Sequence, residues 1–202
     1  MSDKKAHWEK VYETKSDYEV SWYQELPTES LELVAYLNLN FSSKIIDIGG
    51  GNSNFTGELL EQGYADLSIL DISEKALSRT KYKIGNENVQ YIASDVLEFQ
   101  PKNQFTLWHD RAAFHFLTDK NEIQQYIELV NKAIEQGGYL ILATFSTTGP
   151  LKCSGLEITQ YSKDELSKLF YNDFELIQSF ETVHQTPFDT EQNFIYTVFR
   201  KR

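Results

Sequence analysis

The sequence has little cysteine and no long apolar run. Its only cysteine is Cys153, so the chain has no partner for an internal disulfide and no cysteine-based zinc site, and we expect no metal centre. No stretch approaches the ~20 apolar residues that cross a membrane. The opening "MSDKKAHWEK" lacks the apolar segment of a signal peptide. We therefore expect a cytoplasmic protein that is not associated with a membrane.

Basic residues are also in short supply. The chain has nineteen lysines and arginines and thirty acidic residues, which gives a net charge of -11. Such a chain repels nucleic acid unless it has a local basic patch, and none is evident, so we expect no nucleic-acid partner. With 202 residues and a hydrophobic fraction of 41%, the sequence predicts one globular domain over residues 1–202. Nothing in it indicates the oligomeric state.

Buried strands and helices alternate along the chain. Helices are expected over residues 26–39, over 55–62 with an end at Gly63, over 74–84 with Ser73 as the cap, and over 119–136 with an end at Gly137. Asp119 with Glu122, and Ser162 with Glu165, have the spacing of capping boxes. The expected strands are "KIIDIG", "LSILDIS", "VQYIASD", "FTLWHD" and "YLILATF", followed by an alternating pair near "FELIQSFETV" and "NFIYTVFRK".

This order predicts a doubly wound, Rossmann-like α/β fold with a seven-stranded sheet. The sheet is mostly parallel, ends in an antiparallel C-terminal hairpin, and has helices on both faces. A ligand of such a fold lies at the carboxyl ends of the strands.

The glycine turn in "IIDIGGGNSNF", residues 45–55, narrows the choice of ligand class. A phosphate-binding loop needs Gly-Lys-Ser/Thr, and no lysine follows these glycines. A dinucleotide fingerprint needs a third glycine where Asn54 stands. Asp47, just before the turn, would also repel a pyrophosphate, whereas it is harmless to a cofactor without phosphate. An NAD-linked oxidoreductase is therefore the first alternative rather than the main interpretation.

Three acidic motifs follow three consecutive strands: D-x-G-x-G at 47–51, Asp71, and Ser-Asp-Val at 94–96. As a set they resemble the class I S-adenosylmethionine-dependent methyltransferases over almost the whole chain. The resemblance implies S-adenosylmethionine as cofactor. It implies that Asp47 positions the amino-acid portion, that Asp71 accepts hydrogen bonds from both ribose hydroxyls, and that Asp95 contacts the adenine amino group. The implied cofactor-binding set is Trp22, Asp47, Gly49, Gly51, Asn52, Ser53, Asp71, Ile72, Asp95, Val96 and Asp110.

"WHDRAAFHF", residues 108–116, matches the place where this family has residues beside the methyl group. We predict Asp110, Arg111 and His115 as catalytic residues, with Asp110, His109 or His115 as the base if the acceptor must lose a proton. His109 is expected to pack or hydrogen-bond locally. The loop after the fifth strand, residues 146–162, is the expected acceptor-binding loop, and its Cys153 is expected to be a small, partly buried side chain rather than a nucleophile.

Residues 1–25 carry Trp8, Tyr12, Trp22 and Tyr23. They predict either a packing arm or an aromatic lid over the cofactor. "SWYQ" and the glycine turn look like a subgroup that includes lysine methyltransferases of elongation factor 1A or citrate synthase. This chain departs from them, since Asp110-Arg111 stands where those enzymes often have Asp-Lys. The acceptor, a small molecule or a protein side chain, stays open, and a non-catalytic methyltransferase-like binding module is the second alternative.

Overall fold

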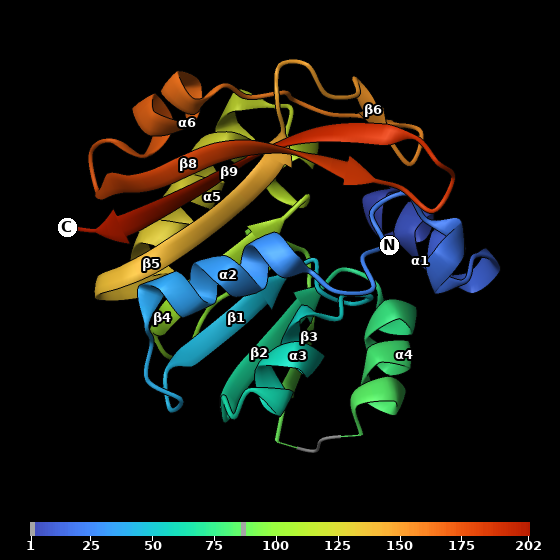
Figure 1. The fold of residues 1–202 in the computed structure, drawn as a ribbon, viewed down its shortest axis with the longest axis horizontal. Coiled ribbons are helices and arrows are strands. Elements are labelled where there is room, and N and C mark those ends of the chain that lie inside the picture. The colour runs from blue at the N-terminus through green and yellow to red at the C-terminus, as the bar shows by residue number, and fades with distance from the viewer. Residues whose placement is uncertain (1–2, 86–87) are drawn as a thin grey trace.

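The protein is a three-layer α/β sandwich around a seven-stranded sheet (Figure 1). The computed structural model describes residues 3–85 and 88–202. The sheet order is β3-β2-β1-β4-β5-β9-β8, with β1 to β5 parallel and β9 and β8 antiparallel at the end. The strands are β1 (Lys44–Ile48), β2 (Asp66–Asp71), β3 (Gln90–Ala93), β4 (Phe105–Arg111), β5 (Ile134–Phe145), β8 (Phe174–Gln185) and β9 (Glu191–Lys201). The predicted fold class is confirmed.

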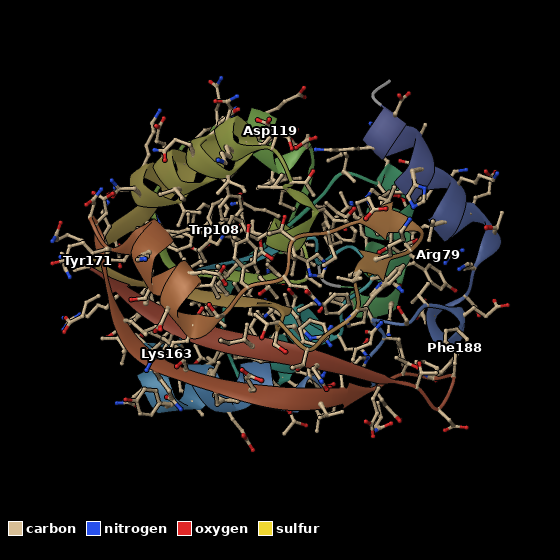
Figure 2. All side chains as sticks on the ribbon, turned by 90° about the horizontal axis from the view of Figure 1, so that it is seen from above. Arg79, Trp108, Asp119, Lys163, Tyr171 and Phe188 are labelled. Atoms are coloured by element: carbon tan, nitrogen blue, oxygen red, sulfur yellow. The ribbon has the colours of Figure 1, made fainter. Side chains whose placement is uncertain are left out.

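Helices cover both faces of the sheet. One apolar cluster joins α5 (Lys120–Ala133) and α6 (Lys163–Phe170) to one face, and another joins α2 (Thr28–Leu37), α3 (Phe55–Glu61) and α4 (Glu74–Ile84) to the other. Figure 2 shows Trp108 in the interior and Tyr171 and Phe188 at the periphery. Trp108 is fully buried, and its Nε1 donates to Tyr126 Oη at 3.0 Å. The chain order reverses between β1 and β4, which places the ligand crevice at their carboxyl ends.

The predicted helix ends are mostly confirmed. Ser73 caps α4 by accepting from Ala76 N, and Ser162 and Glu165 form the predicted capping box of α6. The predicted helix over 119–136 instead ends at Ala133, because Ile134 has an extended backbone and pairs with Phe105 in the sheet.

The other predicted capping box, Asp119 with Glu122, is only half formed. Asp119 accepts from the amides of Asn121 and Glu122, as a cap should. The Glu122 carboxylate does not return to the cap but binds Lys4 Nζ at 2.8 and 3.0 Å. A long-range ion pair has replaced the local hydrogen bond.

One helix and one small hairpin were not predicted. The N-terminal segment forms α1 (Asp3–Thr14), which lies beside α4 (Figure 1), and the loop after β5 contains a small hairpin of β6 (Lys152–Cys153) and β7 (Leu156–Glu157). Short 3₁₀ turns complete the chain: η1 (Asp17–Glu19), η2 (Val96–Glu98) and η3 (Phe114–Phe116). Across the described ranges, no helix combines the length and apolar character that a membrane span needs.

Candidate active site

Two adjoining cavities occupy the crevice at the carboxyl ends of β1, β2 and β4. The larger, of about 830 Å³, is here called the main cavity, and the smaller, of about 490 Å³ along the glycine turn, the turn cavity. Trp22, Ile48, Gly49 and Arg111 line both. The predicted site residues that reach at least one cavity are Trp22, Asp47, Gly49, Asn52, Ser53, Asp71, Ile72, Asp95, Val96 and Arg111.

The glycine turn packs directly against two carboxylates. Gly49 has a φ of +67°, which favours glycine. A Cβ added to Gly50 would collide with the carboxylate of Asp47, and one added to Gly51 would lie 2.6 Å from Asp71 Oδ2. The sequence therefore needs glycines here to bring the backbone and both acids into contact.

Asp47 belongs to a buried polar chain. Its Oδ1 lies 2.7 Å from His109 Nδ1, and His109 Nε2 lies 2.9 Å from Ser30 Oγ. A carboxylate only accepts, so Nδ1–H donates to Asp47. Phe55 stacks on the His109 ring with centroids 3.9 Å apart. Asp47 Oδ2 is buried and has no hydrogen-bond partner among the described residues, although Asp47 lines the turn cavity.

His109 was expected to pack or hydrogen-bond locally; it is buried and packs against Phe55, but its hydrogen bonds are to residues distant in sequence. Asp47 and His109 are opposite one another in the paired strands β1 and β4, 62 residues apart in sequence. Their side chains point to the same face of the sheet because they occupy equivalent positions in neighbouring strands. Sequence reasoning also missed Ser30, since nothing local marks it.

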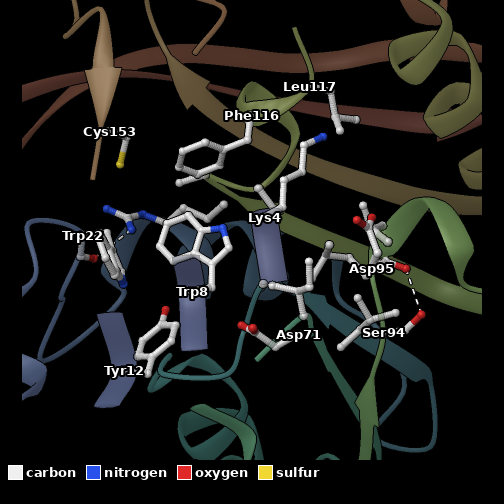
Figure 3. A pocket seen from close by; sticks show the side chains of 18 residues that line it. Lys4, Trp8, Tyr12, Trp22, Asp71, Ser94, Asp95, Phe116, Leu117 and Cys153 are labelled. Atoms are coloured by element: carbon white, nitrogen blue, oxygen red, sulfur yellow. Dashed lines mark hydrogen bonds between the residues drawn. The ribbon is translucent and has the colours of Figure 1, made fainter. Parts of the chain in front are cut away.

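Asp71 and Asp95 line one side of the main cavity, and Cys153 lies toward the other (Figure 3). Asp71 accepts from Ser73 N at 2.8 Å and from Gly51 N at 3.0 Å. Burial raises the pKa of Asp71 to about 6, with smaller contributions from the charges of Asp47 and Glu9, against the lowering effect of those two hydrogen bonds. Asp95 Oδ1 accepts from Leu97 N at 3.0 Å.

The structure does not bring Asp110 to either cavity, which corrects its predicted place beside the methyl group and the cofactor. Along β4 the side chains alternate, so Leu107 packs in one apolar cluster while Trp108 packs in the other, and Asp110 points to the side of Trp108. Its carboxylate is fully buried and accepts from Ala113 N, Phe114 N and, at 2.6 Å, Tyr126 Oη.

Replacing Asp110 with alanine should therefore cost stability rather than ligand binding. Three donors would lose a buried acceptor, and we expect a loss of about 2–4 kcal/mol in the free energy of unfolding. Urea unfolding measures the loss, and titration of the folded variant with S-adenosylhomocysteine should give wild-type affinity. A large loss of affinity with unchanged stability would restore Asp110 to the site.

His115 is a second correction. It is fully buried and lines neither cavity, so the prediction that it lies at the reaction centre does not hold. Its Nδ1 accepts from Phe145 N at 3.4 Å. Burial, and to a lesser degree the charge of Arg111, lower the pKa of His115 to about 3. It is a neutral packing residue at neutral pH.

Arg111 extends into the crevice from the end of β4. Its Nε donates to Tyr196 Oη at 3.0 Å and its Nη1 to Trp22 O at 3.1 Å. The guanidinium lies over the Phe194 ring, 4.7 Å from its centroid. Of the three predicted catalytic residues, Arg111 is the one that lines the cavities.

The N-terminal aromatics form part of the main cavity. Trp8 and Tyr12 line it from α1, and Trp8 meets Trp22 and Phe116 edge to face, with centroids 5.5 and 5.2 Å apart (Figure 3). Contacts on two sides hold α1 in place: the pair between Lys4 and Glu122, and a hydrogen bond from Glu74 N to a carboxylate oxygen of Glu9 at 2.7 Å. Lys4 and Phe116 are wall residues that sequence reasoning missed.

Cys153 is a buried wall residue of the main cavity. Burial raises the pKa of its thiol to about 12, so it is not a thiolate at neutral pH. Within residues 3–85 and 88–202, no group of three or more histidine, cysteine or acidic side chains is arranged to hold a metal ion.

A family model described as a methyltransferase domain matches residues 45–138, from β1 into β5. Among curated proteins, the chain is 27% identical over 103 residues to malonyl-[acyl-carrier protein] O-methyltransferase 2 of Ilyobacter polytropus, covering 50% of this chain and 39% of that protein. It is 24% identical over 189 residues to human EEF1A lysine methyltransferase 2, covering 88% and 77%. It spans only 22% of mouse eEF1A lysine and N-terminal methyltransferase.

Solved structures share the fold. The N-methyltransferase NodS of Bradyrhizobium japonicum, in complex with S-adenosylhomocysteine, has a TM-score of 0.70 and 15% identity, covering 96% of this chain and 97% of that one. The 1,6-didemethyltoxoflavin-N1-methyltransferase of Burkholderia thailandensis, also with bound S-adenosylhomocysteine, has a TM-score of 0.75 and 17% identity, covering 98% and 86%. At this identity the likeness concerns the fold.

Proposed function

We propose that this chain is a class I S-adenosylmethionine-dependent methyltransferase, that S-adenosylmethionine is its cofactor, and that it transfers the methyl group to an acceptor by in-line displacement. One observation carries the proposal. Asp47, Asp71 and Asp95, from the ends of three neighbouring strands, line two adjoining cavities against the glycine turn. Carboxylates in this arrangement suit a ligand with an ammonium group, ribose hydroxyls and an adenine amino group.

The residues of the turn cavity fit the amino-acid portion of the cofactor. Asp47 Oδ2 is a buried acceptor without a partner among the described residues, which suits an ammonium group. His109, which is itself hydrogen-bonded to Ser30, binds the other oxygen of that carboxylate. Gly49, Asn52 and Ser53 line the same cavity, where backbone and amide groups approach the ligand. Arg111 lies at the junction with the main cavity.

The main cavity fits the adenosine portion. Both oxygens of Asp71 already accept one backbone hydrogen bond, and each keeps a lone pair for a ribose hydroxyl. Asp95 and Val96, with Ile72, surround the place for adenine. Trp8, Trp22 and Phe116 supply the apolar walls beside the sulfonium, where aromatic faces stabilise a cation.

The protein's main contribution to methyl transfer is alignment. An in-line displacement needs the accepting atom held about 3 Å from the methyl carbon, in a site from which water is excluded. The covering helix α1 and the walls of the main cavity provide that enclosure. Asp110 and His115 lie outside the cavities, so we assign neither of them the role of a base.

We further propose that residues 1–25 are a lid on a single methyltransferase domain of residues 1–202; residues 1, 2, 86 and 87 lie outside the described residues. We propose that the protein is cytoplasmic, since a single cysteine fits a reducing compartment, and that it does not bind nucleic acid, since its net charge is -11. The acceptor is a small molecule or a protein side chain, since the relatives named above include enzymes of both kinds by their names.

A labelled-methyl assay tests the proposed function. The protein is incubated with methyl-labelled S-adenosylmethionine and a lysate separated into protein and small-molecule fractions. We expect label in one of the two fractions, and less of it at subsaturating S-adenosylmethionine when the Asp71→Asn variant replaces the wild type. Absence of transfer to both fractions, with intact cofactor binding, would favour a binding module.

The raised pKa of Asp71 predicts a pH-dependent affinity. Ribose hydroxyls donate to the ionised carboxylate, whereas below pH 6 the unliganded protein holds a proton on Asp71 that binding must displace. Affinity for S-adenosylhomocysteine should be constant above pH 7 and fall by roughly tenfold per unit well below pH 6. Titration calorimetry from pH 8 to pH 5 measures it. A profile in wild type that equals the profile of Asp71→Asn would contradict this assignment.

A further inference from the structure

Arg111 has an unsatisfied donor group inside the site. Tyr196 Oη and Trp22 O accept from Nε and Nη1, while Nη2 is buried and without a hydrogen-bond partner among the described residues. No carboxylate in residues 3–85 and 88–202 forms an ion pair with Arg111 within 4.0 Å. Glu29, whose charge acts on both Tyr196 and His184, is hydrogen-bonded to Gln24 and Thr182 instead.

Three titratable groups near Arg111, namely His115, His184 and Cys153, are neutral at neutral pH. Burial and, after it, the Arg111 charge lower the pKa of His115 to about 3 and of His184 to about 4. Burial raises the pKa of Cys153 to about 12, although Arg111 acts in the opposite direction. The guanidinium is thus a permanent cation that has no ion-pair partner within 4.0 Å among the described residues.

A buried N–H of a cation without a partner is costly, and a bound ligand, ion or water that accepts from it removes that cost. Arg111 lines both the main and the turn cavity, so whatever completes it belongs to the bound ligands. The guanidinium carbon lies over the Phe194 ring, 4.7 Å from its centroid, and this cation–π contact supports it. The position, the charge and the free donor all fit an anionic oxygen.

We propose that Arg111 binds a carboxylate or similar oxyanion of a ligand through Nη2, at the junction of the two cavities. This inference rests on the proposed function and deepens it. Two ligands can supply the anion: the carboxylate of the cofactor's amino-acid portion, or an acidic group on the methyl acceptor. In the second case the acceptor class is an organic acid or an acidic segment of a larger molecule.

The experiment has two arms, each with wild type, Arg111→Gln and Arg111→Lys. The first arm compares by calorimetry the binding of S-adenosylmethionine and of decarboxylated S-adenosylmethionine, which lacks the carboxylate but keeps the ammonium and sulfonium groups. The second arm titrates benzoate and acetate into the protein with and without saturating S-adenosylhomocysteine. Arg200→Gln is the matched control, since Arg200 is exposed and lies on β9 away from both cavities.

If the cofactor supplies the anion, wild type should bind S-adenosylmethionine at least tenfold more tightly than the decarboxylated form, and Arg111→Gln should remove that preference. If the acceptor supplies it, wild type should bind both cofactors alike, and benzoate should bind in an Arg111-dependent way. Arg111→Lys, which keeps the charge but not the planar fork, should retain part of either effect.

Wild type alone already tests the inference, so a variant that fails to fold does not remove the test. No preference for the carboxylated cofactor together with no saturable binding of benzoate or acetate overturns the role of Arg111. If wild type binds no cofactor at all, the proposed function is contradicted. The titration of benzoate and acetate without cofactor would still test Arg111.

Discussion

Replacing Asp71 with asparagine should lower the affinity for S-adenosylhomocysteine at least about tenfold at pH 8, where the carboxylate is ionised. Hydrogen bonds to a charged acceptor contribute about 1.5–3 kcal/mol each, and Asp71 is proposed to accept two from the ribose. The asparagine amide would also turn one NH₂ group toward Gly51 N or Ser73 N, which now donate to Asp71 at 3.0 and 2.8 Å. Titration calorimetry at pH 8 measures the affinity.

The control for this variant is Asp66→Asn. Asp66 begins β2, at the end of the strand opposite to Asp71, and lines neither cavity. It should keep wild-type affinity. Unfolding in urea shows how much of any loss in Asp71→Asn reflects stability. Unchanged affinity in folded Asp71→Asn would mean that Asp71 only holds the glycine turn.

Replacing His109 with leucine should destabilise the protein by about 3–5 kcal/mol and weaken cofactor binding. Asp47 and His109 are each 2% exposed, and removing His109 leaves the buried Asp47 carboxylate without its hydrogen-bond donor. Ser30→Ala removes only the hydrogen bond between His109 and Ser30 and should lower the free energy of unfolding by about 1 kcal/mol. Urea unfolding measures both variants.

A second comparison separates stability from the positioning of Asp47. Methylthioadenosine lacks the amino-acid portion, so folded His109→Leu should bind it as wild type does while binding S-adenosylhomocysteine less tightly. The double variant Asp47→Leu/His109→Leu should recover stability without recovering that affinity, because it removes the unpaired charge. Equal losses for both ligands in His109→Leu would contradict a positioning role.

The acidic residues of the site were predictable because they follow strands directly. In a parallel sheet the carboxyl ends of neighbouring strands meet at one edge, so Asp47, Asp71 and Asp95 had to lie near each other once the strands were identified. The position of Asp110 also follows from strand geometry, but it was predicted incorrectly. Side chains alternate along a strand, and a shift of one residue moves a side chain to the opposite face, so Arg111 lines the cavities and Asp110 does not.

Contacts that depend on strand order could not be predicted from the sequence. Asp47 and His109 meet because β1 pairs with β4, and Ser30 joins them from α2 on the same face. The N-terminal helix escaped prediction for another reason. It buries only Val11 and Tyr12, and it is held by distant partners, Glu122 in α5 and Glu74 in α4, rather than by a strong apolar stripe.

Competitive calorimetry with S-adenosylhomocysteine and NAD tests the central assignment most directly. Wild type should bind one equivalent of S-adenosylhomocysteine, with an affinity that falls in Asp71→Asn, and should bind NAD neither alone nor in competition. Saturable NAD binding in a protein that does not bind S-adenosylhomocysteine would contradict the assignment and favour a dinucleotide enzyme.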